Sequence, residues 1–260
     1  MKKWIYIIPL LLILVSFKSG TSIRDVKNKA FKRGEVLKYR VHYGLIDAGE
    51  AVLEVKDENK KIGGRNTLHV VGTGKSLGAF DWFFKVRDRY ESYIDEKGIM
   101  PWLFIRRVDE GGYKLNRDIT FNQYKSTAKV EDSSYVVPKY AQDILSSFYY
   151  ARSLDLQNLN IGDTVTINTF FDYENYPLGI KYVGKEVMES DVGDIRCLKF
   201  KPLLQVGRVF KEEEDMTVWI SDDECKVPIR VQADILVGSI KMDISSVEGL
   251  VGSLAIVEED

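Results

Sequence analysis

The chain has 260 residues, of which 37 are lysine or arginine, 39 are aspartate or glutamate, two are histidine and two are cysteine. The formal charge of −2 gives no support for nucleic-acid binding, and the spacing of the few histidines and cysteines is no zinc pattern. The length allows a sizeable core in one large or two small domains.

The N-terminus has the organisation of a secretory signal peptide. Residues 1–3 are cationic, residues 4–15 are uncharged and mostly apolar, and residues 16–22 are mostly small and polar. The apolar run is shorter than the roughly 18 residues that a spanning helix needs. We therefore expect cleavage near residue 20 and export to the periplasm or cell envelope. An uncleaved anchor is the alternative, because the segment has no clean Ala-x-Ala site.

Hydrophobic alternation predicts a first β half over residues 21–137. Leu37, Tyr39, Val41 and Tyr43 alternate with charged and polar residues, which is typical of a half-buried strand. A turn is expected at Ile46–Gly49. Further strands are expected at residues 50–56, 67–72, 84–94, 101–108, 114–121 and 126–131, with turns at 60–65 and 95–98.

A central helix and linker are expected over residues 138–160, with Pro138 at the start of the helix and Gly162 among the stop signals. One helical face carries an apolar stripe that ends in an arginine, namely Ala141, Ile144, Leu145, Phe148, Tyr149 and Arg152. Asp143, near the start, suits the positive end of the helix dipole. Arg152, if buried, needs a carboxylate or carbonyl partner, so it could clamp the helix to a sheet or anchor a ligand.

The second β half, residues 161–260, repeats landmarks of the first. Gly34-Glu35 has a counterpart in Gly162-Asp163, which is 128 residues later. Phe84 corresponds to Phe210, and the segment 90–101 resembles 216–228, each segment ending in a proline. The nearly constant offset favours an internal duplication. Chance similarity between hairpins is the alternative.

These patterns predict a mainly β protein. Strands with one polar and one apolar face are typical of antiparallel sheets. At this spacing they form a sandwich, a barrel or a strongly curved sheet. We favour an open, curved sheet or half-barrel with the central helix packed on its concave face, because the apolar stripe of the helix needs an apolar surface.

Three groups of residues resemble an exported bacterial family. They are Phe31-x-x-Gly34-Glu35-x-Leu37-x-Tyr39 with Ala48-Gly49-Glu50-Ala51, then Asp143 with Ser147-Phe148-Tyr149-Tyr150-x-Arg152, and Trp219-Ile220-Ser221-Asp222-Asp223 with Val227-Pro228. The family is DUF3108, a domain of unknown function, and the resemblance covers nearly the whole exported chain. It implies an envelope protein and brings no catalytic residues. A looser likeness, in architecture only, is to the half-barrel carriers of the outer-membrane lipoprotein sorting system.

No motif points to catalysis, to a nucleotide or to a metal. The segment 72–76 contains Gly-Lys-Ser, but a phosphate loop needs a glycine where His69 stands, so we expect a glycine-rich strand end and no cofactor. The acidic clusters 212–215 and 222–224 match no calcium loop and are expected to be a hairpin arm and a turn. His42 is expected on the solvated side of its strand.

Cys197 and Cys225 are the only cysteines. The sequence places Cys197 in a strand and Cys225 in a turn. Outside the cytoplasm a disulfide between them is permitted, and two free thiols are the alternative.

The predicted ligand-binding residues are Trp82, Phe83, Phe84, Trp102 and Arg152. The cluster of Phe80 with residues 82–84 is too apolar for a routine surface loop, so it could be core, line a cleft, or contact a membrane or partner. Trp102 and Phe104 are expected across a hairpin from it. Four arginines nearby in sequence could frame an acidic head group, namely Arg87, Arg89, Arg106 and Arg107.

Two functions are carried forward. The first is a non-enzymatic envelope protein that binds an apolar or amphipathic envelope ligand, such as a lipid, in the concave face of its sheet. The second is an assembly module that docks an envelope protein partner through sheet edges or a hairpin arm, Leu203–Asp215. A hydrolase acting on envelope polymers is a third class, and no set of residues supports it.

Overall fold

The computed structural model describes residues 23–44, 46–204, 212, 214–235 and 238–258. They form one antiparallel sheet of 15 strands and two helices, α1 (Gly78–Phe83) and α2 (Ile144–Arg152). The strands before α2 are β1 (Val36–Tyr43), β2 (Ile46–Val55), β3 (Lys60–Ile62), β4 (Arg65–Ser76), β5 (Arg87–Asp95), β6 (Pro101–Glu110), β7 (Tyr113–Asn122), β8 (Thr127–Val130) and β9 (Ser133–Val136). Those after it are β10 (Thr164–Phe171), β11 (Glu174–Met188), β12 (Ile195–Leu203), β13 (Met216–Ser221), β14 (Pro228–Asp234) and β15 (Ser239–Glu248).

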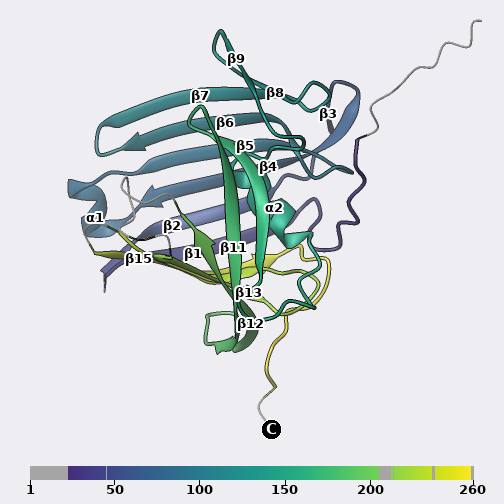
Figure 1. Ribbon diagram of the computed structural model, residues 1–260. Helices are drawn as coiled ribbons and strands as arrows, with labels where there is room; N and C mark the ends of the chain where they lie inside the picture. Colours follow the sequence, from purple (N-terminus) through teal and green to yellow (C-terminus); the bar gives the residue numbers. More distant parts are fainter. Residues whose placement is uncertain (1–22, 45, 205–211, 213, 236–237, 259–260) are drawn as a thin grey trace, which may run out of the picture.

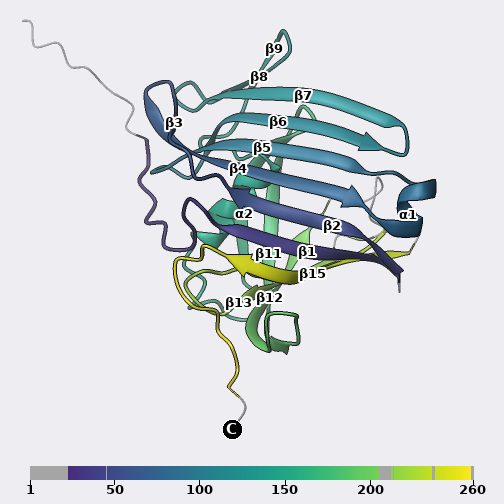
Figure 2. The same cartoon turned by 180° about the vertical axis from the view of Figure 1, so that it is seen from behind.

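The sheet is strongly curved, and α2 lies on its concave side (Figures 1 and 2). Its strands run in the order β10 to β15, then β1, β2 and β4 to β9, while β3 pairs with β4. In Figure 1, β11 crosses in front of the strands of the first half. The predicted open, curved antiparallel sheet with one central helix is therefore confirmed. In the described part of the chain, neither helix has the length and apolar character needed to cross a membrane.

The two ends of this sheet come close to each other. Gln142, just before α2, forms a β-bridge with Thr169 of β10. The ring of Tyr135 in β9 lies 5.5 Å from the ring of Phe170 and 5.8 Å from that of Tyr173, measured between centroids. The strand edges of β9 and β10 are thus partly covered, and the sheet is barrel-like.

The two halves repeat one strand order. The sequence β1, β2, β4, β5, β6, β7 has its counterpart in β10 to β15, each forming a run of adjacent strands. Gly34 and Gly162, at φ 82° and 99°, precede the first strand of each run, and Ile99 and Lys226, both at φ 44°, precede the prolines that open β6 and β14. This is the arrangement that an internal duplication produces. Phe210, the predicted partner of Phe84, lies outside the described residues, as do the expected signal peptide and most of the hairpin arm.

Helix α2 is shorter than the sequence predicted, and Pro138 does not begin it. The Oδ1 atom of Asp143 accepts hydrogen bonds from the backbone N–H groups of Leu145 and Ser146, each at 2.8 Å, and the Ser146 hydroxyl accepts one from the Asp143 N–H. This capping box fixes the start of the helix. Tyr140, at φ 62°, is incompatible with a helix that begins earlier.

Two other local predictions were wrong. Helix α1 was not predicted, because six residues are too few for a periodic pattern, and β5 begins at Arg87 where a strand was expected from Phe84. The turn expected at Ile46–Gly49 is part of β2, and the chain turns instead at Gly44, which has a φ of 59°.

Helix α2 packs on the concave face near the β5–β6 hairpin. Tyr149 is fully buried there, in a cluster with the apolar side chains of Ala30, Phe31, Val55, Leu68, Val70, Ile94 and Ile99. The Gln142 side chain, at the same end, donates a hydrogen bond to the carbonyl of Ile99. Helix α1 lies at the opposite end of the strands (Figure 1). The concave face therefore has one end filled by α2 and another that faces α1.

Candidate functional site on the concave face

Contacts with α2 identify the residues that face inward. A Cβ atom on Gly72 would lie 3.3 Å from the side chain of Leu145, and the Ser92 hydroxyl donates a hydrogen bond of 2.6 Å to Asp143. Because side chains alternate along a strand, Gly74 of β4 and Tyr90 of β5 also face inward. Their neighbours in sequence lie on the outer, convex face.

At the end of the sheet near α1, apolar side chains on the inner face are only partly buried. Val218, Val231, Met242 and Val41 are successive register partners across β13, β14, β15 and β1. All four are only half-buried, although the ordinary place for such residues is a closed core. The inner face therefore offers accessible apolar surface.

Gly74 marks open space on this inner face. A Cβ atom built at this position would meet no heavy atom within 4 Å. Its φ is not in the left-handed region, so the backbone does not require a glycine here. A glycine in the middle of a strand forgoes packing, and here it leaves room above the sheet.

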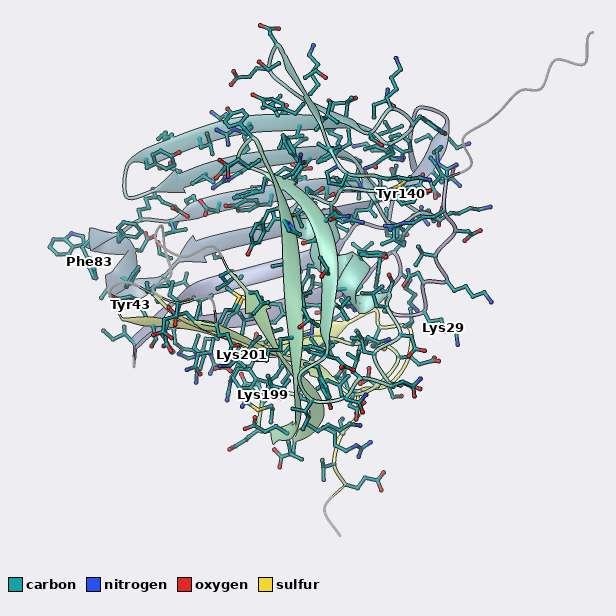
Figure 3. The ribbon with its side chains drawn as sticks, viewed as in Figure 1. Lys29, Tyr43, Phe83, Tyr140, Lys199 and Lys201 are labelled. Atoms are coloured by element: carbon teal, nitrogen blue, oxygen red, sulfur yellow. The ribbon has the colours of Figure 1, made fainter. Side chains whose placement is uncertain are left out.

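Helix α1 presents aromatic side chains at the rim of the sheet. Trp82 is 90% exposed and Phe83 is 66% exposed, and no residue of the helix is buried. The ring of Phe80 holds the helix in place, at 5.7 Å from the ring of Tyr43 and 5.1 Å from that of Phe83. Figure 3 shows Phe83 projecting from α1 near Tyr43. Further exposed apolar residues stand where neighbouring strands begin or end, namely Ile46, Leu77, Phe84, Tyr113 and Ile240.

The five predicted ligand-binding residues do not form one site. Trp82, Phe83 and Phe84 are together at the rim, whereas Trp102 lies at the far end of β6, is 6% exposed, and donates its indole N–H to Asp95 at 3.0 Å. Arg152 is 1% exposed and its guanidinium pairs with both carboxylate oxygens of Glu35, at 2.6 and 2.7 Å. Both of these side chains are engaged within the core.

The four arginines expected around a head group are divided between the two faces. Arg87, Arg89 and Arg107 are on the outer face, where they pair with carboxylates of Asp81, Glu91 and Asp118. Arg106 alone faces inward, since it is the register partner of Tyr90. Sequence analysis did not identify Gly74 or Arg117, because their significance depends on which face of the sheet they occupy.

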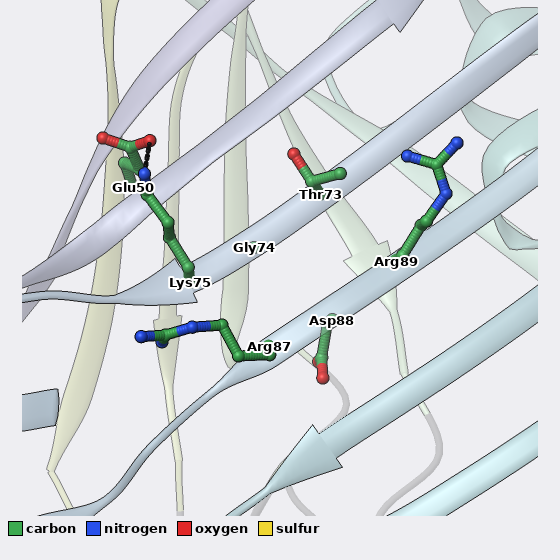
Figure 4. A pocket seen from close by; sticks show the side chains of 7 residues that line it. All are labelled: Glu50, Thr73, Gly74, Lys75, Arg87, Asp88 and Arg89. Atoms are coloured by element: carbon green, nitrogen blue, oxygen red, sulfur yellow. Dashed lines mark ion pairs between the residues drawn. The ribbon is translucent and has the colours of Figure 1, made fainter.

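The segment that resembled a phosphate loop is part of strand β4. Its Thr73 and Lys75 line a shallow outer pocket of about 300 Å³ (Figure 4). The Lys75 ammonium lies 2.7 Å from the Glu50 carboxylate. Residues 72–76 are strand throughout, and α1 begins only at Gly78, so the segment forms no loop whose backbone could cradle a phosphate.

The remaining candidate groups serve the structure. Within the described ranges, no three His, Cys, Asp or Glu side chains form a group that could hold a metal. His42 lies on the polar side of β1 beside Asp47 and Asp243, and its side chain is 17% exposed. Cys197 and Cys225 are both buried and free, and burial raises the pKa of the Cys197 thiol to about 12.

A comparison with known families matches residues 38–245 to the profile of DUF3108, described as a protein of unknown function. The chain belongs to the DUF3108 family. No curated protein sequence matches it.

Several solved structures align with this DUF3108 protein over most of its length, and one of them has a TM-score above 0.5. A β-barrel-like protein with the DUF1849 domain, from Brucella abortus, has a TM-score of 0.53 at 8% identity, over 88% of this chain and 99% of the other. A candidate lipoprotein from Parabacteroides distasonis has a TM-score of 0.36 at 10% identity, over 87% and 100%. A candidate exported protein with a YmcC-like fold, from Bacteroides fragilis, has a TM-score of 0.35 at 9% identity, over 86% and 99%.

Several of the residues that resemble DUF3108 meet around Arg152. Glu35 pairs with its guanidinium, the ring of Phe31 lies 4.7 Å from that of Tyr149, and the Tyr39 hydroxyl donates to the carbonyl of Pro228. These contacts join the N-terminal segment, α2 and the second half of the sheet. In this DUF3108 chain the motif therefore stabilises the fold, and the accessible inner face lies elsewhere.

Proposed function

We propose that this DUF3108 protein is an exported, non-enzymatic envelope protein that binds an apolar or amphipathic ligand on the concave face of its sheet. The observation that carries the proposal is the open space above Gly74, beside half-buried apolar side chains. Burial of such surface by a ligand contributes about 25 cal/mol per Å². The aromatic side chains of α1 stand at the rim of this face and provide an apolar path to it.

The Gly74→Leu variant is expected to lose the ligand and keep its fold. The new side chain occupies the open space, and it introduces no backbone strain because φ is not positive. Native mass spectrometry of the protein purified from the periplasm without detergent measures the bound, solvent-extractable mass. Thr73→Leu, on the outer face of the same strand, is the matched control and should retain it. Equal loading of both variants would count against the concave face as the binding surface.

Replacing Trp82 and Phe83 by serine is expected to weaken ligand retention without changing the melting temperature. These side chains are 90% and 66% exposed, so their loss removes little packing. Retention is read by mass spectrometry, and folding by circular dichroism. The control replaces Val136 and Ile161, which are 79% and 76% exposed on other strands and loops, by serine. A cooperative loss of folding in the first variant would place its aromatic residues in the core instead.

A further inference from the structure

Two arginines meet on the inner face over one carboxylate. Arg106 of β6 and Arg117 of β7 are register partners. Their NH1 atoms lie 3.1 and 2.6 Å from the same Oδ1 atom of Asp172, in the turn between β10 and β11. The two arginine side chains are only 16% and 15% exposed. Two cations and one anion, whose carboxylate side chain is 26% exposed, are thus held together in a partly buried group.

The charge of this group is unbalanced. A guanidinium stays protonated in proteins, so the three side chains carry an excess positive charge. Glu110 also interacts electrostatically with Arg106, and its carboxyl group forms a hydrogen bond with Asp88. Burial, together with this hydrogen bond, raises the pKa of Glu110 to about 7. Among the described residues, the ion pairs of Arg106 and Arg117 are those with Asp172. Two partly buried guanidiniums that share one ion-paired carboxylate favour an additional anionic ligand.

Arg106 also has an unused donor. Its Nε atom is buried and has no hydrogen-bond acceptor in the part of the chain that the structure describes. The guanidinium lies against aromatic rings, 4.9 Å from the centroid of Phe171 and 5.7 Å from that of Tyr90. The ring of Tyr173 lies 4.3 Å from the Arg117 guanidinium. Aromatic contacts hold the planar cations in position, and a buried donor without a partner calls for an acceptor.

Arg106 lies on the same face as the open space above Gly74, two strands away from it. The row of register partners Leu53, Gly72, Tyr90 and Arg106 runs across β2, β4, β5 and β6. Gly74, with open space above it, is two residues from Gly72 on the same face. An amphipathic molecule could therefore reach the arginines with its polar end while its chain lies along the sheet towards α1.

We propose that Arg106 and Arg117 bind the anionic head group, a carboxylate or a phosphate, of an amphipathic ligand on the concave face. The inference rests on the proposed function and adds the class of ligand to it. A purely structural role is the competing explanation, in which both arginines only hold the β10–β11 turn against β6 and β7. That role predicts no preference for charged ligands.

The test compares cis-parinaric acid with its uncharged methyl ester, using the fluorescence of the bound probe and the whole exported protein. The two probes share one apolar chain and differ in the charge of the head group. We expect the acid to bind at least about 10-fold more tightly than the ester, because its carboxylate can form a charge-assisted hydrogen bond with a partly buried arginine. Arg106→Gln and Arg117→Gln should remove this preference and leave the affinity for the ester unchanged. Arg107→Gln, the neighbour on the outer face, is the matched control and should keep the preference.

Competitors distinguish the source of the anion. Displacement by palmitate favours a carboxylate, displacement by hexadecyl phosphate favours a phosphate, and equal displacement by inorganic phosphate would overturn the assignment of an amphipathic ligand. Equal affinity of the unsubstituted protein for acid and ester would overturn the head-group site and leave the proposed function standing. Failure to bind either probe would count against the proposed function itself. The ratio in the unsubstituted protein decides the question even if a variant does not fold.

Discussion

Replacing Arg152 by methionine is expected to lower the free energy of unfolding by about 3–5 kcal/mol, because it leaves a buried carboxylate without its partner. Glu35 is 0% exposed, and both of its oxygens accept hydrogen bonds from the Arg152 guanidinium. The same guanidinium also donates to the carbonyls of Ala30 and Cys225. The single substitution therefore removes the donor from four buried acceptor oxygens. Urea unfolding followed by tryptophan fluorescence measures the change.

Two controls separate the buried charge from the loss of the side chain. The double variant Glu35→Met with Arg152→Met should recover much of the lost stability, because it leaves no unpaired charge in the core. Arg107→Met removes a pair with Asp118 whose side chains are 40% and 54% exposed, and should cost at most about 1 kcal/mol. A cost for Arg152→Met as small as that of Arg107→Met would show that the pair does not hold the fold together.

The Asp143→Asn substitution is expected to make the protein more stable relative to the unsubstituted chain as the pH rises. Burial is the main cause that raises the pKa of Asp143 from 3.8 to about 6, against the lowering effect of its hydrogen bonds to Ser146, Ser92 and Leu145. The folded protein therefore keeps a proton that the unfolded chain has already released. Because the unfolded chain binds fewer protons between these two pKa values, stability falls as the pH rises through this window.

The size of this effect follows from the shift. A pKa difference of about two between the folded and unfolded chains corresponds to a loss of about 3 kcal/mol in the free energy of unfolding between about pH 4 and about pH 7. Asparagine fits the same cap, since its oxygen accepts from the helix N–H groups without an ionisable proton. The measurement is the difference in unfolding free energy between the two proteins at each pH. Asp132→Asn, in an exposed turn, is the control. A difference that stays constant with pH would mean that Asp143 titrates alike in the folded and unfolded chains.

Periodicity was sufficient to predict most of the sheet. The alternation at Leu37 to Tyr43 and the prolines at 101 and 228 correctly indicated strands and hairpins, since side chains alternate strictly along a strand. The limits of the helix were less predictable, because an apolar stripe does not say where the helix begins. Asp143 and Ser146, which form the capping box, gave the signal that decides it.

The candidate site was predictable only in part. Trp82 and Phe83 stood out because their segment is too apolar for a routine surface loop, and this can be recognised within a few consecutive residues. Both side chains are exposed in the structure. Arg106 and Arg107 are adjacent in sequence, yet they occupy opposite faces. Which of them faces α2 depends on the register of β5 and β6, and a shift by one residue would exchange the two. Sequence alone does not fix that register.

The pairing of β1 with β15 also governs when the sheet can be completed. Val36 and Glu248 are register partners although they stand near opposite ends of the chain. A contact of such large separation forms only after the last strand has been synthesised and released. Until then β1 presents a strand edge that can pair with other chains. The interval between the emergence of β1 and that of β15 is therefore the period in which a newly made chain is most prone to aggregation.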